Sequence, residues 1–465
     1  MPVPKAARFA LIALVALMAV PAATVRAATR MPIGFFDDPS FRWSPQRATN
    51  LQAAAAAGAS VIHTTASWSQ LAPKKPADPS NGDDPAYKLA DLDELVYQSG
   101  IHGLRVMIDI TGTPKWANGG KAPNVMPKRL SDLTTFARML ATRYNGHQGH
   151  GSVSLWSVWN EPNLQLFLTP QFIGKRIVGP ANYAKLYKAA YAGIKKGNPW
   201  AQVAIGETSA RGRDKPLAGT SATVAPGTFA RLLSQVKGLK FDAWAHHPYP
   251  TTPNMRPLQR VRYPNVTLST LPQFEKDLKR WFHRSVPVWI TEYGHETKPG
   301  EPRGVTTGQQ ASYAKQALTI ARKDPNVQMF VWFTFRDSSG NPWQSGLELP
   351  SGAHKPAYAA FSSLARLIDG TSTTVKGGSK PKITVFLPYL GYYSQPGATI
   401  GMTYFVFDGK RAIANGQPTA LLNPDYSVTF TPTFTAVKGH TYSVIVNAIE
   451  ANGHSESRTE VVTAV

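Results

Sequence analysis

The sequence predicts an α/β fold, a (β/α)8 TIM barrel followed by a small all-β sandwich of the immunoglobulin or fibronectin type III kind. Over residues 31–369, eight apolar strand-like runs alternate with helix-like patterns. A short polar stretch rich in Gly, Ser and Lys follows at 370–382 and predicts a linker. Residues 383–465 then show short alternating runs separated by turns, with no helix pattern.

The first 28 residues have the pattern of a secretory signal peptide. Lys5 and Arg8 precede an apolar run at 9–20, which is too short to span a bilayer. Small residues around 25–27 suit a signal peptidase, and no later segment is apolar enough to cross a membrane. We therefore expect a signal peptide at 1–28, a secreted protein and no membrane span.

The barrel elements follow one another in a regular order. The strands are expected at residues 33–37, 60–65, 104–110, 153–160, 202–206, 241–247, 286–291 and 327–335. The helices are expected at 44–58, 89–99, 131–144, 182–196, 228–236, 271–284, 309–322 and 357–367. Ser44 and Ser131 are candidate N-caps, and Gly58 suits a helix C-terminus. Eight such units predict a closed barrel, whose active site lies at the C-terminal ends of the strands. An open doubly wound sheet would instead need a Gly-rich phosphate loop after the first strand, and residues 34–37 (Gly-Phe-Phe-Asp) do not form one.

The composition describes a globular chain with an excess of positive charge. Hydrophobic residues make up 42% of the chain, and there is no Cys for a disulfide or a lipid anchor. The formal net charge is +22, which suits nucleic acid, an anionic envelope or an acidic polysaccharide as partner. The basic residues are scattered and no nucleic-acid motif is present. We therefore expect no nucleic-acid partner, loose adhesion to an anionic cell envelope or matrix, and a monomer.

Two predicted strands end in a glutamate. The apolar run at 153–159 leads into Asn160, Glu161 and Pro162, and the run at 286–291 leads into Glu292. Strands four and seven lie nearly opposite each other in an eight-stranded barrel, so the two side chains can converge over its mouth. A proton donor paired with a nucleophilic carboxylate is what a double-displacement glycosidase requires. The two glutamates are therefore the predicted catalytic pair.

Neighbouring side chains suggest supporting roles. Asn160 can hydrogen-bond a sugar 2-hydroxyl, and Tyr249 can hold the carboxylate of Glu292 ionised. His247 either binds substrate, modulates the acid or is structural, and Trp332 either forms the floor of a sugar subsite or belongs to the core. The remaining mouth carboxylates are expected to be structural or subsite residues: Asp109, Glu207, Glu296 and Glu301. The chain has no H-E-x-x-H or similar cluster, so we expect neither a metal nor another cofactor.

These motifs resemble those of glycoside hydrolase clan A, a group of retaining β-glycosidases. Residues 159–162 (Trp-Asn-Glu-Pro) look like the strand-four signature of the clan, in which the glutamate is the acid/base. Residues 289–294 (Trp-Ile-Thr-Glu-Tyr-Gly) look like the strand-seven signature, in which the glutamate is the nucleophile. The resemblance implies that Glu161 is the acid/base and Glu292 the nucleophile. It covers residues 31–369 and does not extend to 383–465.

Within the clan, the chain is similar to two families. Residues 58–73 resemble strand two of family 5 cellulases and mannanases, whereas residues 113–117 and 332–333 look more like family 39, which includes β-xylosidases. His63 stands where family 5 has an Arg that supports the nucleophile, and strand three lacks the terminal His of family 5. His63 and Trp116 are accordingly predicted, with the neighbours above, to bind substrate.

The expected function is therefore a secreted retaining glycoside hydrolase that cleaves a β-linked glycan, cellulase-like or xylosidase-like. A non-catalytic glycan-binding protein on the same barrel would usually lose one carboxylate, and a transglycosylase would use the same two. The sugar, the linkage and endo or exo action depend on long loops such as 74–87 and 207–228 and stay open. The sandwich is either a spacer or a carbohydrate-binding module, with Tyr389, Tyr392 and Tyr393 as a candidate platform.

Overall fold

The computed structural model describes residues 31–465 except 220, 340–342, 369–371 and 424–425. The predicted signal peptide, residues 1–28, lies outside the described residues, as does the start of the predicted linker. Eight parallel strands close into a barrel in the order β1-β10-β9-β8-β7-β4-β3-β2. Their bounds are β1 Ile33–Phe36, β2 Val61–Ser67, β3 Arg105–Thr111, β4 Leu155–Val158, β7 Gln202–Ser209, β8 Ala243–His247, β9 Val288–Tyr293 and β10 Val327–Trp332. The predicted fold class is confirmed.

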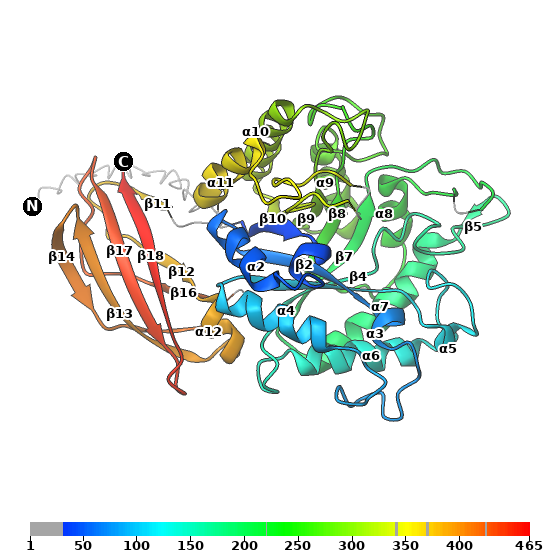
Figure 1. Cartoon of the computed structure of the whole chain (residues 1–465), viewed down its shortest axis with the longest axis horizontal. Coiled ribbons are helices and arrows are strands. Elements are labelled where there is room, and N and C mark those ends of the chain that lie inside the picture. The colour runs from blue at the N-terminus through cyan, green and yellow to red at the C-terminus, as the bar shows by residue number, and fades with distance from the viewer. Residues whose placement is uncertain (1–30, 220, 340–342, 369–371, 424–425) are drawn as a thin grey trace, which may run out of the picture.

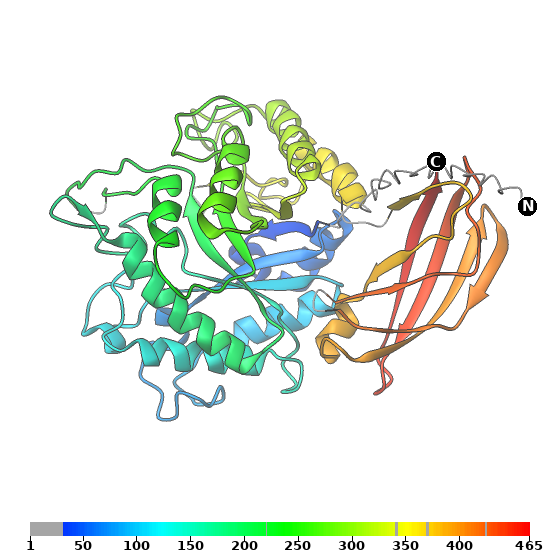
Figure 2. The same cartoon turned by 180° about the vertical axis from the view of Figure 1, so that it is seen from behind.

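Helices surround the barrel (Figures 1 and 2). The eight long ones are α2 Arg47–Ala56, α4 Ala90–Ile101, α6 Leu130–Arg143, α7 Gly179–Gly197, α8 Pro226–Ser234, α9 Leu271–Phe282, α10 Thr307–Lys323 and α11 Pro356–Ile368. The loops carry the short helices α1 Asp38–Phe41, α3 Trp68–Leu71 and α5 Lys115–Asn118, and the small hairpin β5 Phe172–Ile173 and β6 Arg176–Ile177. None of the described helices is both long and apolar enough to cross a membrane.

Two predicted helix caps are wrong. The N-cap of α2 is Gln46, and Ser44 instead accepts a hydrogen bond from the Gln46 amide through its side chain. Helix α6 begins one residue earlier than predicted, with Arg129 as N-cap, so Ser131 lies inside the helix. Gly58 does follow α2 with a φ of 95°, a left-handed conformation that glycine adopts without steric cost.

The barrel interior is filled rather than hollow. Its buried residues are Val61, Met107, Leu155, Ala204, Ala243, Ala245, Trp289, Met329 and Val331. A second, larger core lies between the strands and the helices. Gly34 on β1 is required by the close approach to β2, because a Cβ atom there would lie 1.7 Å from the carbonyl oxygen of Val61.

The C-terminal region is an all-β sandwich with one unexpected helix. The larger sheet has the order β11-β18-β17-β13-β14, with β15 beside β13, and the smaller sheet pairs β12 with β16. The bounds are β11 Ser372–Val375, β12 Ile383–Phe386, β13 Thr399–Asp408, β14 Arg411–Gly416, β15 Thr419–Leu421, β16 Ser427–Phe430, β17 Thr441–Ile449 and β18 Ser455–Ala464. A shared apolar core fills the space between the sheets.

Two expectations for this region need correction. Residues 372–375, which the sequence places in a linker, form β11 and pair in parallel with β18. The expectation that the region contains no helix is also wrong, because α12 spans Pro388–Tyr393. Tyr389 and Tyr393 lie on this helix. The ring of Tyr393 stacks on His454 with centroids 3.7 Å apart, which occupies one face of the supposed sugar platform.

The sandwich lies against the N-terminal ends of the barrel strands. Arg105, the first residue of β3, places its guanidinium 5.7 and 5.6 Å from the ring centroids of Phe386 and Tyr426. Ser152, shortly before β4, is hydrogen-bonded to the hydroxyl of Tyr426. Figures 1 and 2 show the sandwich at one end of the molecule. The C-terminal strand ends therefore lie away from the sandwich.

Candidate active site

A large cavity opens at the C-terminal ends of the barrel strands. Its volume is about 1160 Å³, and Asn160, Glu161, Tyr249 and Glu292 are among its lining residues. Glu161 follows β4 with a left-handed φ of 39°, and Glu292 lies in β9. Non-glycine residues in this conformation are uncommon and concentrate at functional sites. The cavity is large enough for several sugar residues of a chain.

One buried histidine lies between the two glutamates. The Nδ1 atom of His247 is 3.2 Å from Oε1 of Glu161 and 3.7 Å from Oε2 of Glu292. The sum of these two distances means that the two oxygens are at most about 7 Å apart. The carboxyl groups of retaining glycosidases are roughly 5–5.5 Å apart, which lies within that limit. The two predicted carboxylates are thus brought together at one imidazole.

Glu292 is buried and supported by a phenol. The hydroxyl of Tyr249 donates a hydrogen bond to Oε2 of Glu292 at 3.0 Å. Burial raises the pKa of Glu292 to about 7, while the positive charge of His247 and the Tyr249 hydrogen bond oppose that rise. The negative charges of Glu161 and Glu207 add to the rise. The protonation state of Glu292 is therefore sensitive to its neighbours near neutral pH.

A second carboxylate lies behind His247. Nε2 of His247 is 2.8 Å from Oε2 of Glu207, and the same oxygen accepts a hydrogen bond from Thr291 Oγ1 at 2.6 Å. Burial alone would lower the pKa of His247, but the charges of Glu292, Glu161 and Glu207 raise it well above its usual value. Burial raises the pKa of Glu207, but the hydrogen bond from His247 and the positive charge of His247 outweigh burial and lower that pKa to about 2. His247 and Glu207 thus form a buried ion pair.

Sequence reasoning missed the importance of Glu207. It expected a structural or subsite residue, whereas Glu207 contacts the histidine that joins both predicted catalytic groups. The register between β7 and β8 shifts between Ile205 and Thr208, and Glu207 has a φ of 44°. The available signal was Gly206, since an isolated glycine inside a strand pattern often marks a bulge.

Two more buried groups complete the base of the site. Burial raises the pKa of Asp109 well above its usual value, and the nearby charge of Glu207 raises it further. Asp109 also accepts a hydrogen bond from Ser157 at 3.3 Å. Burial lowers the pKa of His63 to about 4, so its imidazole is neutral at pH 7.

Three of the predicted substrate-binding residues do not line the cavity. His63 is 2% exposed and packs against the ring of Phe36, which lines the cavity in its place. Trp332 is fully buried, and its indole N–H donates to the Ser345 carbonyl, so no ring face is left for a sugar. Trp116 packs edge-on against a second tryptophan and donates to a backbone carbonyl outside the cavity.

The other three predicted substrate-binding residues are Asn160, Tyr249 and His247. Asn160 and Tyr249 line the cavity, whereas His247 is fully buried and contacts the two glutamates instead of the open space. Besides Tyr249, the aromatic residues that line the cavity are Phe36, Phe167, Phe333 and Trp343. Within the described part of the chain, no group of three or more His, Cys, Asp or Glu side chains is arranged to hold a metal ion.

Comparisons with known proteins agree with the barrel fold. The family model described as cellulase (glycosyl hydrolase family 5) matches residues 27–336. No curated protein matches the chain.

Several solved structures share the fold. A family 39 glycoside hydrolase from Bacteroides cellulosilyticus WH2 is 19% identical, with 86% of this chain and 81% of that chain covered and a TM-score of 0.53. A glucosidase from Croceicoccus marinus is 12% identical, with 95% and 97% covered and a TM-score of 0.56. A family 39 β-xylosidase from Caulobacter crescentus is 17% identical, with 82% and 84% covered and a TM-score of 0.51.

Proposed function

The chain belongs to the cellulase family, glycosyl hydrolase family 5, and from that premise we propose that it is a secreted retaining hydrolase of a β-linked glycan. The proposal assigns Glu292 as nucleophile and Glu161 as general acid/base. The observation that carries it is the approach of both carboxylates to the single buried imidazole of His247. The N-terminal pattern of residues 1–28 supports secretion.

The reaction proceeds in two displacements. In the first, an oxygen of Glu292 bonds to the anomeric carbon while the glycosidic bond breaks, and Glu161 gives its proton to the leaving oxygen. In the second, Glu161 takes a proton from water, whose oxygen bonds to the anomeric carbon and releases Glu292. The configuration of the anomeric carbon is inverted in each displacement, so the product keeps the configuration of the substrate.

The surrounding residues of this chain suit those steps. The hydroxyl of Tyr249 and the cationic ring of His247 favour the carboxylate form of Glu292, which the attack requires. Asn160 lines the cavity next to Glu161, and the proposal assigns it a hydrogen bond to a sugar hydroxyl, an interaction that strengthens in the transition state.

The proposal is tested by replacing each carboxylate and adding azide. We expect Glu292→Ala to abolish hydrolysis of an activated aryl β-glycoside, and azide to restore turnover with a glycosyl azide of inverted configuration. With Glu161→Ala, azide is expected to give the retained configuration, because Glu292 still forms the glycosyl-enzyme. NMR of the anomeric proton identifies the products. Near-wild-type hydrolysis by Glu292→Ala would refute the assignment.

A further inference from the structure

We propose that the glycan is acidic, carrying carboxylate or sulfate groups that bind a cluster of arginines beside the catalytic pair. This inference rests on the proposed glycosidase function and names its substrate class. The cavity that holds Glu161 and Glu292 is also lined by Arg211, Arg213, Arg260 and Arg262, which we call the arginine wall. Among the residues that the structure describes, the two predicted catalytic glutamates are the only acidic side chains lining the same cavity.

The arginine wall lacks the ion pairs that some other arginines of this chain have. Arg143 is bound by Asp93 and Asp83, and Arg336 by Glu348. Among the described residues, by contrast, no carboxylate pairs with any member of the wall, and all four members are exposed. Four like charges on one side of a cleft repel one another unless an anion neutralises them.

The two loops that carry the wall are fixed to each other. Arg211 and Arg213 come from the loop between β7 and α8, and Arg260 and Arg262 from the loop between β8 and α9. The guanidinium of Arg211 donates to the Thr251 carbonyl at 2.9 Å, and the amide of Gly212 donates to Asn265 at 2.8 Å. The backbone amide of Val266 also donates a hydrogen bond to the carbonyl of Ala210 at 2.8 Å. The wall therefore faces the cavity on a prearranged support, as a binding site requires.

The chemistry of the wall suits an acid better than a neutral sugar. All the cationic side chains in this lining are arginine, whose planar guanidinium binds a carboxylate or sulfate through two parallel hydrogen bonds. Neutral sugars are held chiefly by aromatic faces and neutral hydrogen-bonding groups, which this cavity provides near Glu292 through Phe333 and Trp343. The arginine wall therefore adds a binding site for anions to the groups that can hold a neutral sugar.

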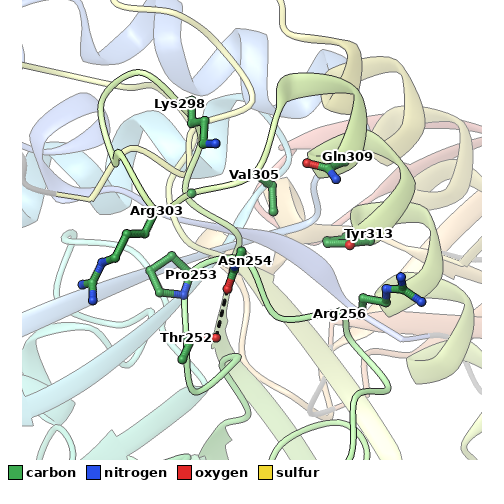
Figure 3. A pocket seen from close by; sticks show the side chains of 10 residues that line it. Thr252, Pro253, Asn254, Arg256, Lys298, Arg303, Val305, Gln309 and Tyr313 are labelled. Carbon is green, nitrogen blue, oxygen red and sulfur yellow. Dashed lines mark hydrogen bonds between the residues drawn. The ribbon is translucent and has the colours of Figure 1, made fainter.

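The basic lining continues into a neighbouring hollow of about 540 Å³ (Figure 3). Figure 3 shows Arg256, which lies on the β8–α9 loop together with Arg260 and Arg262, and Lys298 and Arg303 on the loop before α10. A small intervening pocket shares Arg211 with the catalytic cavity and Arg303 with the hollow. Arg303 is partly neutralised by Glu301 at 3.5 Å. Glu296 also lines the intervening pocket, and beyond it a polyanionic chain leaving the cavity on this side would meet Arg256 and Lys298.

The test uses competing oligosaccharides that share one backbone. Hydrolysis of a small neutral aryl β-glycoside reports the free catalytic site. Neutral cello-oligosaccharides, their C6-carboxylated counterparts and their sulfated counterparts are the competitors. We expect at least one of the acidic competitors to inhibit about tenfold more strongly than the neutral one, with a preference that declines steeply as salt rises.

Variants then locate the effect. Arg260→Gln with Arg262→Gln should reduce the acidic preference at least about fivefold. The matched control is Lys185→Gln with Arg231→Gln, which removes the same charge from exposed positions on α7 and α8 and should keep the preference. Circular dichroism confirms folding of both variants.

The outcomes separate the two proposals. Three results would overturn the proposal of an acidic substrate. The first is inhibition by the neutral competitor that equals or exceeds inhibition by the acidic ones. The others are an equal loss of the acidic preference in the control variant, and inhibition by poly-glutamate as strong as that by the acidic sugars. The relative strength of the carboxylated and sulfated arms identifies the anion. Failure of the glycosidase proposal has a different signature, since the neutral reporter would then not be hydrolysed and a fluoro-glycoside would not label Glu292.

Discussion

At the scale of single residues, the site depends on the charge of His247. Its ring is fully buried yet faces three carboxylates, those of Glu161, Glu207 and Glu292. Of these, Glu207 is also buried and lies on the far side of the ring from the cavity. In the proposed mechanism Glu207 is therefore a positioning residue, which keeps His247 cationic so that His247 in turn favours ionised Glu292.

Glu207→Gln tests this arrangement. The amide cannot stabilise a buried imidazolium, so the pKa of His247 should fall and Glu292 should lose a neighbouring positive charge. Removing the negative charge of Glu207 by itself lowers the pKa of Glu292, but the charge of His247 acts on that carboxyl more strongly, so the pKa of Glu292 should rise above its value of about 7. Because Glu292 must be ionised to act as the proposed nucleophile, activity should be lost as pH falls through that pKa, and the acid limb of kcat/KM should move to higher pH. We expect a drop of about tenfold or more at pH 7. An unchanged limb would show that Glu207 is only structural.

Tyr249→Phe isolates the other support of the nucleophile. It removes one hydrogen bond to the carboxylate form of Glu292 and leaves the ring contacts in place. The acid limb should again move to higher pH, and kcat should fall about tenfold or more while KM changes little. Steady-state kinetics between pH 4 and pH 9 measure both. A change in KM alone would instead assign Tyr249 to ground-state sugar binding.

Some site residues could be predicted from the sequence and others could not. The positions of Glu161 and Glu292 followed from apolar runs ending in an acid, which is a local pattern. Trp332 was predicted to form the floor of a sugar subsite or to belong to the core, and its position near the end of a strand could not decide between the two. The structure buries it, and the β10–β9 register shifts between Phe330 and Trp332. The ring of Phe333 lines the cavity instead. Such an irregularity depends on the neighbouring strand and has no signal in the strand's own sequence.

At the scale of elements, the order of strands and helices was predictable and the details of their ends were not. Apolar periodicity locates the eight barrel strands because each is buried on both faces. Helix starts depend on one side chain each, and Ser44 and Ser131 fit the cap pattern without serving as caps. Helix α12 was missed because six residues are too few to show a helical periodicity.

Gly34→Ala tests how closely β1 approaches β2. The added methyl would lie 1.7 Å from a backbone oxygen, which no side-chain movement can relieve. We expect the free energy of unfolding to fall by about 3 kcal/mol or more, measured by denaturant titration. The matched control is Gly308→Ala in the first turn of α10, where a Cβ meets nothing within 4 Å. That change should be neutral or stabilise by up to about 1 kcal/mol. Equal effects of the two substitutions would contradict the strand geometry.

At the scale of the whole molecule, the sandwich and the catalytic cavity lie at opposite ends of the barrel. The sandwich covers Arg105 and Ser152 near the strand starts, whereas Glu161 and Glu292 lie near the strand ends. The sequence indicates two regions through a change of pattern, but it holds no signal for which end of the barrel the second region would cover. That choice depends on tertiary contacts between residues hundreds of positions apart.

This arrangement predicts that the sandwich contributes to stability rather than to the reaction. Tyr426→Ala should remove the ring over Arg105 and the hydroxyl bound to Ser152, leaving a buried guanidinium less covered. We expect a lower unfolding temperature, with kcat/KM on a small aryl glycoside unchanged within about twofold. Differential scanning calorimetry and kinetics on the same sample check this. Tyr426→Phe, which keeps the ring, should be milder, and a loss of activity without a loss of stability would contradict the separation.

The position of the last residue has a practical consequence. Val465 is 61% exposed at the end of β18, on the sandwich and thus away from the cavity mouth. A tag, a tether or a solid support attached there would leave the mouth facing outward. The protein fixed to a bead by this terminus should therefore still act on polymers too large to enter the pores of the bead.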